Sequence, residues 1–359
     1  MTMHPGVTIR RGVTMCPAGM RRGVMRRDVL GRPGVVRRPA PIVFLVIAIA
    51  LAAVGTGTAD IPVRTASLPP VDKSLLDFSD PEPLTRPLDG VAQLVALRDA
   101  YPDRIQRMEY RNGDWAILVN GEWIYWANGR MLPRKARHHW YEFNRFPFYP
   151  YRDGPLVVPD LSDREEQRLR TVLARMNEQP PQRHGAFPGT LYGVRTAGQA
   201  REKMVTVTLM GHRIRVHPMI REPLRRVQEE IDVLLRDDPE VQAFNLDLLR
   251  VEGFLWRSIA GTQTVSNHGY GIAVDLVPRS YFRRNAYWRW SEQAGIEEWW
   301  NIPVERRWTV PRVIVEAFER HGFVWGGRWL FFDAIHFEYR PELFLLEDLP
   351  DHEDVPDLS

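Results

Sequence analysis

Two short segments carry the side chains whose types and spacing are suited to catalysis. The first segment, residues 256–275, places His268 seven residues before Asp275, with Gly269 and Gly271 between them. On one helix the two side chains would lie about two turns, roughly 10 Å, apart. Two ligands of a single zinc ion, each about 2 Å from the metal, must lie within roughly 4 Å of each other. We therefore expect His268 and Asp275 on different elements.

The glycines and the sequence after them indicate how these side chains could meet. Gly269 and Gly271 allow the backbone to turn sharply after His268. Side chains 272–277 then alternate as in a strand, which places Asp275 on one of its faces. We expect a histidine in a loop to fold back toward an aspartate on a strand.

The second segment, residues 322–342, supplies another imidazole and another carboxylate. It follows a predicted helix at 311–320 and contains Asp333 and His336. Three protein ligands with a fourth position open to water are typical of catalytic rather than structural zinc. His336 can complete such a set, which leaves Asp333 to act as a base. Either segment alone is weak evidence, because an isolated His or Asp beside apolar strands usually has a structural role.

With their flanking residues, the two segments resemble a known family of zinc enzymes. Residues 266–275 read Ser-Asn-His-Gly-Tyr-Gly-Ile-Ala-Val-Asp, residues 323–329 read Phe-Val-Trp-Gly-Gly-Arg-Trp, and residues 333–342 read Asp-Ala-Ile-His-Phe-Glu-Tyr-Arg-Pro-Glu. They are similar to the zinc D-alanyl-D-alanine carboxypeptidases and the related L-alanyl-D-glutamate endopeptidases of phage lysins, whose pattern is S-x-H-x-x-G-x-A-x-D followed by E or D-x-x-H. The resemblance covers roughly residues 205–346.

The resemblance implies a role for each candidate residue. The ligands of one Zn²⁺ per chain would be His268, Asp275 and His336. Asp333 takes the position of the general base, and Arg257 that of an arginine facing the substrate carbonyl. Ser266 matches a residue near the substrate. Independently of the resemblance, Glu338, two residues beyond His336 and on the same strand face, is the second candidate for the base if Asp333 is not the base.

The implied reaction is hydrolysis of an amide bond in the stem peptides of peptidoglycan by a zinc-activated water. Aspartate rather than glutamate at position 333 resembles the lysin-like branch, so the scissile bond stays open between terminal D-alanine, a crosslink and L-alanyl-D-glutamate. The alternative is a non-catalytic, zinc-containing cell-wall-binding protein. Asp333 and Arg257 disfavour it, because a structural site needs neither. A serine hydrolase is disfavoured because the sequence contains no Gly-x-Ser-x-Gly elbow.

The fold implied by the resemblance is α+β, a small, mainly antiparallel sheet flanked by helices as in Hedgehog and DD-peptidase domains, with an additional N-terminal region. Apolar spacing predicts helices at 163–176 and 223–235, and alternation predicts strands within 205–216. We place the zinc peptidase domain at 201–348. The segment 280–308, dense in Trp, Tyr and charged residues, either overhangs the site or packs as a surface insertion.

Residues 89–200 form an expected accessory region outside the resemblance. Here Asn120-Gly121, between apolar runs at 115–119 and 122–126, predicts a two-residue β-hairpin. The register pairs Ile117 with Ile124 and Leu118 with Trp123.

The N-terminal residues differ from the rest of the 359-residue chain in charge. Residues 1–41 carry nine Arg and one Asp, a net of +8; subtracted from the total of +3, this leaves about −5 for the remainder. The mildly acidic body argues against a nucleic-acid partner. Cys16 is the one cysteine and precedes the apolar run, so no disulfide is expected in the mature protein.

Residues 42–54 form an uncharged apolar run, shorter than the roughly 20 residues that span a bilayer comfortably. We interpret residues 1–59 as a signal peptide cleaved after Ala59, or as an uncleaved membrane anchor. The protein is therefore expected to be exported, to the periplasm or beyond, and to touch the membrane only through this segment if it is retained. A linker at 60–88 and an acidic tail at 349–359 complete the organisation.

Overall fold

The computed structural model describes residues 90–346 except 150, 152–153, 155, 157, 159, 179–181, 259–263 and 280. The predicted signal peptide or anchor, the linker and the acidic tail lie outside the described residues. Within the described part of the chain, no helix is long and apolar enough to span a membrane. The fold is α+β, as predicted from the sequence.

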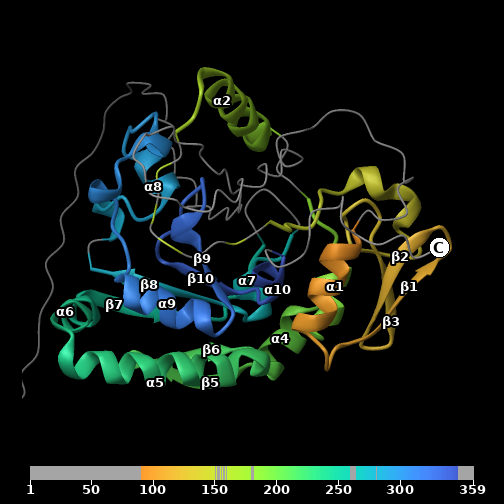
Figure 1. Cartoon of the computed structure of the whole chain (residues 1–359), viewed down its shortest axis with the longest axis horizontal. Coiled ribbons are helices and arrows are strands. Elements are labelled where there is room, and N and C mark those ends of the chain that lie inside the picture. The colour runs from red at the N-terminus through yellow and green to blue at the C-terminus, as the bar shows by residue number, and fades with distance from the viewer. Residues whose placement is uncertain are drawn as a thin grey trace, which may run out of the picture. The chain divides into compact units, whose positions relative to one another are not determined.

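The central sheet has four antiparallel strands in the order β7-β8-β10-β9 (Figure 1). They are β7 (Leu248–Glu252), β8 (Ala273–Pro278), β9 (Phe323–Trp325) and β10 (His336–Tyr339). The middle strands, β8 and β10, are almost fully buried. Apart from Asp275, β8 is apolar, whereas β10 buries the polar side chains of His336 and Glu338. The candidate metal ligands Asp275 and His336 lie on these two strands.

Amphipathic helices pack beside this sheet. Helix α5 (Arg221–Asp237) buries Leu224, Val227 and Ile231, and contacts both α9 (Arg312–Arg320) and the hairpin strand β5 (Val205–Leu209). The hairpin is completed by β6 (His212–Val216), as the alternation predicts. Helix α6 (Pro239–Asp247) follows α5 directly, and the Asp238 side chain caps it by accepting hydrogen bonds from two of its first backbone N–H groups.

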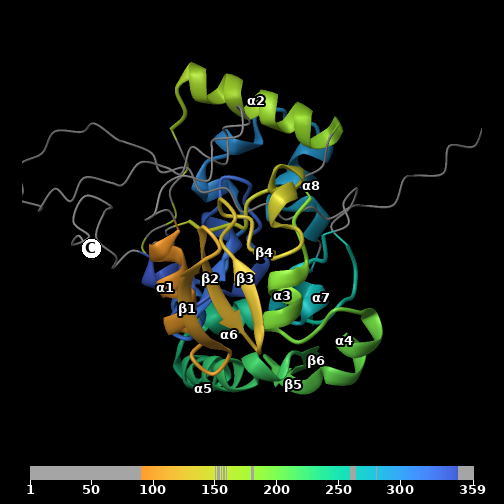
Figure 2. The same ribbon diagram turned by 90° about the vertical axis from the view of Figure 1, so that its right-hand side faces the viewer.

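The upstream region contains α1 (Val91–Ala100) and a second sheet of β1 (Ile105–Arg111), β2 (Asp114–Val119), β3 (Glu122–Tyr125) and β4 (Leu132–Pro133) (Figure 2). The predicted hairpin is confirmed: Ile117 pairs with Ile124, and Leu118 with Trp123. Asn120 and Gly121 at its turn have φ of 46° and 85°, the left-handed conformation that this dipeptide tolerates.

Except for helix α2, the remaining elements are short. They are the 3₁₀ helices at Arg137–Glu142, Pro218–Ile220, Tyr281–Arg283, Trp299–Asn301, Val304–Arg306 and Gly326–Arg328, and the α-helices α2 (Asp163–Glu178), α3 (Ala186–Leu191), α4 (Ala197–Lys203), α7 (Asn267–Tyr270), α8 (Trp288–Gln293) and α10 (Glu342–Leu345).

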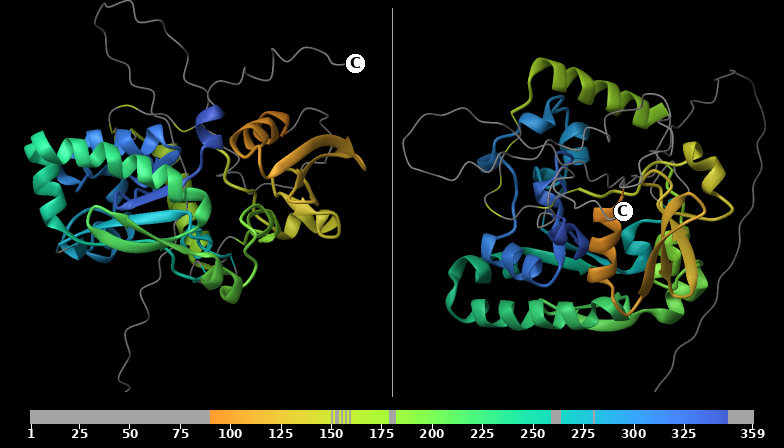
Figure 3. Two further views of the ribbon diagram at one scale, coloured as in Figure 1. Left: turned by 90° about the horizontal axis from the view of Figure 1, so that it is seen from below. Right: turned by 45° about the vertical axis from the view of Figure 1, so that its right-hand side comes forward.

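The upstream region shares its core with the central sheet. Leu94, Ile117 and Phe187 belong to the same buried cluster as Val274 and Phe337. Helix α1 lies beside α10, as the left view of Figure 3 shows in orange and blue. The boundary between the accessory region and the peptidase domain, placed near residue 200, stays a prediction. The buried core contains residues from both sides of it.

The segment 281–308 has its own core. Trp288, Trp299 and Trp300 pack with Phe331 and Phe332, and with Leu169 and Val172 from α2. Helix α8 of this segment is labelled in Figure 1. Of the two alternatives for the segment, the structure shows a packed insertion. This insertion lies against the residues that lead into β10.

Candidate metal centre and active site

His268 lies in the one-turn helix α7, so the expectation of a loop is wrong in detail. The Ser266 hydroxyl caps α7, accepting a hydrogen bond from the His268 N–H at 3.4 Å. The helix ends at Gly271, whose φ of 71° and close approach to Met204 exclude a larger residue. β8 then begins and carries Asp275. Because α7 ends and β8 begins between His268 and Asp275, their side chains meet although only seven residues separate them in the chain.

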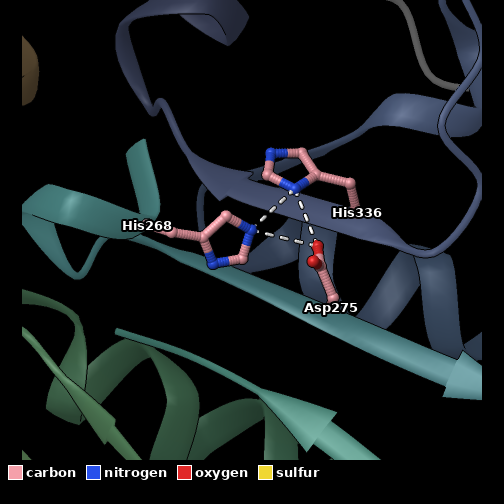
Figure 4. A group of neighbouring side chains, drawn as sticks. All are labelled: His268, Asp275 and His336. Atoms are coloured by element: carbon pink, nitrogen blue, oxygen red, sulfur yellow. Dashed lines mark hydrogen bonds and ion pairs between the residues drawn. The ribbon is translucent and has the colours of Figure 1, made fainter. Parts of the chain in front are cut away.

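Three candidate ligand atoms face one another at the centre of the sheet (Figure 4). His336 Nδ1 lies 2.8 Å and His268 Nε2 lies 3.2 Å from Asp275 Oδ1, and the two nitrogens are 3.3 Å apart. The histidines are only 3% and 2% exposed. The structure thus brings together the three residues assigned as ligands from the sequence, in a group that could hold a metal ion.

The far nitrogen of each histidine has an acceptor. His268 Nδ1 lies 2.7 Å from the carbonyl oxygen of Gly253, and His336 Nε2 lies 3.3 Å from Glu338 Oε2. An N–H at each of these positions leaves a lone pair on the nitrogen that faces Asp275. Such partners fix the tautomer and the ring orientation of metal-binding histidines.

The electrostatics of the cluster suit a cation. Burial alone would raise the pKa of Asp275, but the charges and hydrogen bonds of His268 and His336 hold it well below its ordinary value. Burial would lower the pKa of His336, but Asp275 and Glu338 raise it to about 10. Positive charge is therefore stabilised at this point. Two imidazoles and one carboxylate form a donor set that fits Zn²⁺.

Asp333 lies on the segment that leads into β10 and is only 5% exposed. Its backbone N–H donates to the Gly326 carbonyl at 2.8 Å, and its own carbonyl accepts from the His336 N–H at 3.1 Å. Tyr287, in the insertion, pairs with it in an isolated antiparallel bridge. Its Oδ1 has no hydrogen-bond partner among the described residues. Burial raises its pKa to about 7, against the opposing charge of His336.

Arg257 and Ser266 lie side by side. The Ser266 N–H donates to the Arg257 carbonyl at 3.1 Å, and the adjacent residues Ser258 and Val265 form an antiparallel bridge. The charge of Arg257 also acts on Asp333, whose pKa it lowers. The two predicted substrate residues therefore lie on paired backbone segments, and the charge of Arg257 reaches the candidate base.

Glu338 lies on the far side of His336 from the other candidate ligands. Its Oε2 accepts from Asn267 Nδ2 at 2.5 Å and faces His336 Nε2, while Arg340 Nη1 lies 3.4 Å from its Oε1. Burial opposes ionisation, but these partners lower the pKa of Glu338 to about 2. This carboxylate orients His336, which disfavours it as the second candidate for the base. Asn267 and Arg340 lay within the quoted motifs, but the sequence did not indicate this function.

The comparisons with known proteins agree with this site. Residues 93–148 match a family model described as a domain of unknown function. No curated protein and no solved structure matches the chain. Residues 260–339 match a family model described as D-alanyl-D-alanine carboxypeptidase, over a range that includes all three candidate ligands and Asp333. This match supports the assignment of this part of the chain to the M15 family of peptidases.

Proposed function

We propose that the protein is a zinc-dependent peptidase that hydrolyses an amide bond in peptidoglycan stem peptides. The observation that carries the proposal is the position of Asp333, a buried carboxyl group whose Oδ1 has no hydrogen-bond partner among the described residues, beside the cluster of His268, Asp275 and His336. A structural metal site has four protein ligands and needs no adjacent acid. Three protein ligands with an adjacent base are the combination typical of zinc sites that activate water for hydrolysis.

The positions of these side chains indicate the catalytic role of each. A bound Zn²⁺ would supply Lewis acidity and would lower the pKa of a water molecule toward roughly 7. Asp333 accepts the proton of the attacking water and returns it to the departing amine, so no covalent intermediate with the protein is needed. Arg257 stabilises the negative charge that develops on the carbonyl oxygen of the substrate.

The surroundings of Asp333 support its role as a proton carrier. The insertion and the Gly326 carbonyl hold its backbone on both sides, so the carboxyl group is positioned before substrate arrives. The buried environment also strengthens its interaction with a developing charge, because little water is present to screen it.

The proposed substrate requires export. The Arg-rich leader and the apolar run at 42–54 support a location in the periplasm or outside the cell, where peptidoglycan lies. The chain would reach the membrane only through that run, if it is not cleaved.

Digestion of purified peptidoglycan tests the proposal. The zinc-loaded protein and its Asp333→Asn variant are incubated with the polymer, and the muropeptides are compared by mass spectrometry. We expect the wild type to release D-alanine or a stem-peptide fragment, and the product identifies the bond that is cut. A protein that holds zinc and binds the polymer without any product would instead be the non-catalytic wall-binding protein.

A further inference from the structure

Three buried side-chain donors near the metal cluster have no partner among the described residues, except that the Trp329 N–H approaches the Tyr149 hydroxyl. They are Tyr149 Oη, Trp329 Nε1 and Arg183 Nε. Tyr149 and Trp329 are each only 2% exposed. A buried donor without a partner destabilises the folded state, so such groups are rare unless a water or a ligand satisfies them. Trp288 and Trp299 also have unpartnered indole N–H groups, but these lie within the core of the insertion.

Trp329 and Tyr149 lie on the His336 side of the site. The ring of Trp329 packs against that of His336, with 5.6 Å between their centroids. Tyr149 shares a buried cluster with Trp329. Burial and the nearby charge of Glu338 raise the pKa of Tyr149 far above its ordinary value, so its hydroxyl stays a neutral donor.

Arg183 comes from the upstream region but lies against the catalytic segment. Its backbone N–H donates to Thr264 Oγ1 at 2.9 Å, two residues before Ser266. Its side chain is partly buried and forms no ion pair with the described residues. Burial lowers its pKa to about 10, so it stays charged at neutral pH, and Glu338 and Tyr149 are among the groups that act on it.

No carboxylate of the described residues forms an ion pair with Arg183, although the charge of Glu338 acts on it. Glu338 is the nearby acid, but it is already engaged by Asn267, His336 and Arg340. Arg340 in turn is paired with Glu342. A positive charge and two neutral donors are therefore left together beside the metal cluster. This combination is complementary to an anion with several acceptor sites.

We propose that Arg183, Tyr149 and Trp329 form a subsite for a carboxylate of the peptide substrate. The inference rests on the proposed function for the nature of that substrate. Arg183 and Tyr149 lie outside the residues matched to the peptidase family, so the upstream region supplies most of this recognition. The carboxylate belongs either to the C-terminus of the stem peptide or to one of its acidic residues, and the two sources share this chemistry.

Equilibrium binding of matched peptides tests the subsite. The zinc-loaded full chain carrying Asp333→Asn is titrated calorimetrically with a stem pentapeptide that ends in D-alanyl-D-alanine. Two analogues replace one carboxylate each by a carboxamide, at the C-terminus or at the D-glutamate residue. We expect one replacement to weaken binding by at least about 10-fold, since hydrogen bonds to a charged group are the strong ones. The analogue affected identifies the carboxylate.

The same titrations are repeated with a second substitution in the Asp333→Asn protein. We expect Arg183→Gln to abolish most of the preference for the carboxylate peptide over its carboxamide analogue, and Tyr149→Phe to reduce that preference several-fold. Because the Tyr149 hydroxyl donates to no acceptor among the described residues, its removal should change the melting temperature little. Tyr151→Phe is the matched control. Its hydroxyl donates to Glu319 at 2.5 Å and accepts from the Trp325 N–H at 3.0 Å, so this change should lower the melting temperature and leave the preference intact.

The subsite is overturned if neither carboxamide weakens binding, or if both variants keep the full preference for the acid. The result of this binding experiment can be told apart from the result of the peptidoglycan digestion that tests the proposed function. A preference that depends on Arg183 and Tyr149, in a protein whose wild type cleaves no stem peptide, would support the subsite and refute the peptidase.

Discussion

His336 and Asp275 are direct register partners in the antiparallel pair of β10 and β8, and their side chains meet at 2.8 Å. The sheet ladder therefore sets the separation of two candidate ligands that are 61 residues apart in the chain. Only His268 depends on a separate element, the short helix α7. A site built mainly on adjacent central strands is held more rigidly than one built on loops.

Replacement of any one ligand should release the metal. We expect the purified wild type to hold one zinc per chain, and His268→Ala, Asp275→Ala or His336→Ala to lower the zinc content sharply, because each removes one of three protein ligands. Elemental analysis after dialysis measures this. His321→Ala is the control, since its ring contacts Glu230 instead. Full zinc occupancy in a ligand variant would remove that residue from the site.

Asp333→Asn should separate metal binding from catalysis. The amide keeps the size of the carboxyl group but cannot accept a proton, so turnover should fall by about 10² to 10⁴ while zinc stays bound. Zinc content and muropeptide release are measured on the same samples. Near-normal turnover would show that another group is the base.

Glu338→Gln should weaken zinc binding without removing a ligand. The amide cannot hold the His336 N–H as a carboxylate does, and loss of such a partner typically lowers metal affinity about 10- to 100-fold. Competition with a chelator measures the affinity. Glu342→Gln is the matched control, because Glu342 also pairs with Arg340 but, in the described part of the chain, forms no hydrogen bond or ion pair with His336. Equal zinc affinity in both variants would contradict an orienting role for Glu338.

His217 should make the metal-free protein less stable in acid. It is fully buried, its Nδ1 accepts from the Met219 N–H, and its Nε2 lies 2.9 Å from the Tyr192 carbonyl, which fits a neutral ring. Burial lowers its pKa to about 4. The unfolded chain therefore binds the proton first as pH falls below about 6.5, and stability declines until about pH 4, by at most about 3 kcal/mol.

Urea unfolding of chelator-treated protein between pH 7.5 and 4.5 measures this decline. His217→Gln, which cannot be protonated in this range, should have a lower stability at neutral pH but a shallower dependence on pH. An identical slope in the wild type and the variant would assign the acid sensitivity to other groups.

The exported protein should begin near Asp60. Cleavage after Ala59 would remove the Arg-rich leader and the apolar run, leaving a chain with a mildly acidic charge. N-terminal sequencing of protein from the periplasm or the culture medium checks this start. An intact leader on protein in the cytoplasm would overturn the predicted localisation.

Much of the fold and the candidate ligand set followed from local sequence. Asn120-Gly121 determined a hairpin register because a two-residue turn leaves one pairing for the flanking strands. The seven-residue spacing of His268 and Asp275 excluded a common helix, because helical rise is constant. These inferences succeeded since each depends on the geometry of a few consecutive residues.

The tertiary structure alone decided what surrounds the ligands. Asp333 and Glu338 are both acids close to His336 in the sequence. In the described structure, however, Asp333 Oδ1 has no hydrogen-bond partner, whereas Glu338 Oε2 faces the far nitrogen of the His336 ring. Tyr149 and Arg183 reach the same site from the upstream region. Sequence periodicity reports only which face of an element is buried. Which atom of a side chain meets which partner depends on packing between segments that are distant in the chain, and no local pattern encodes that.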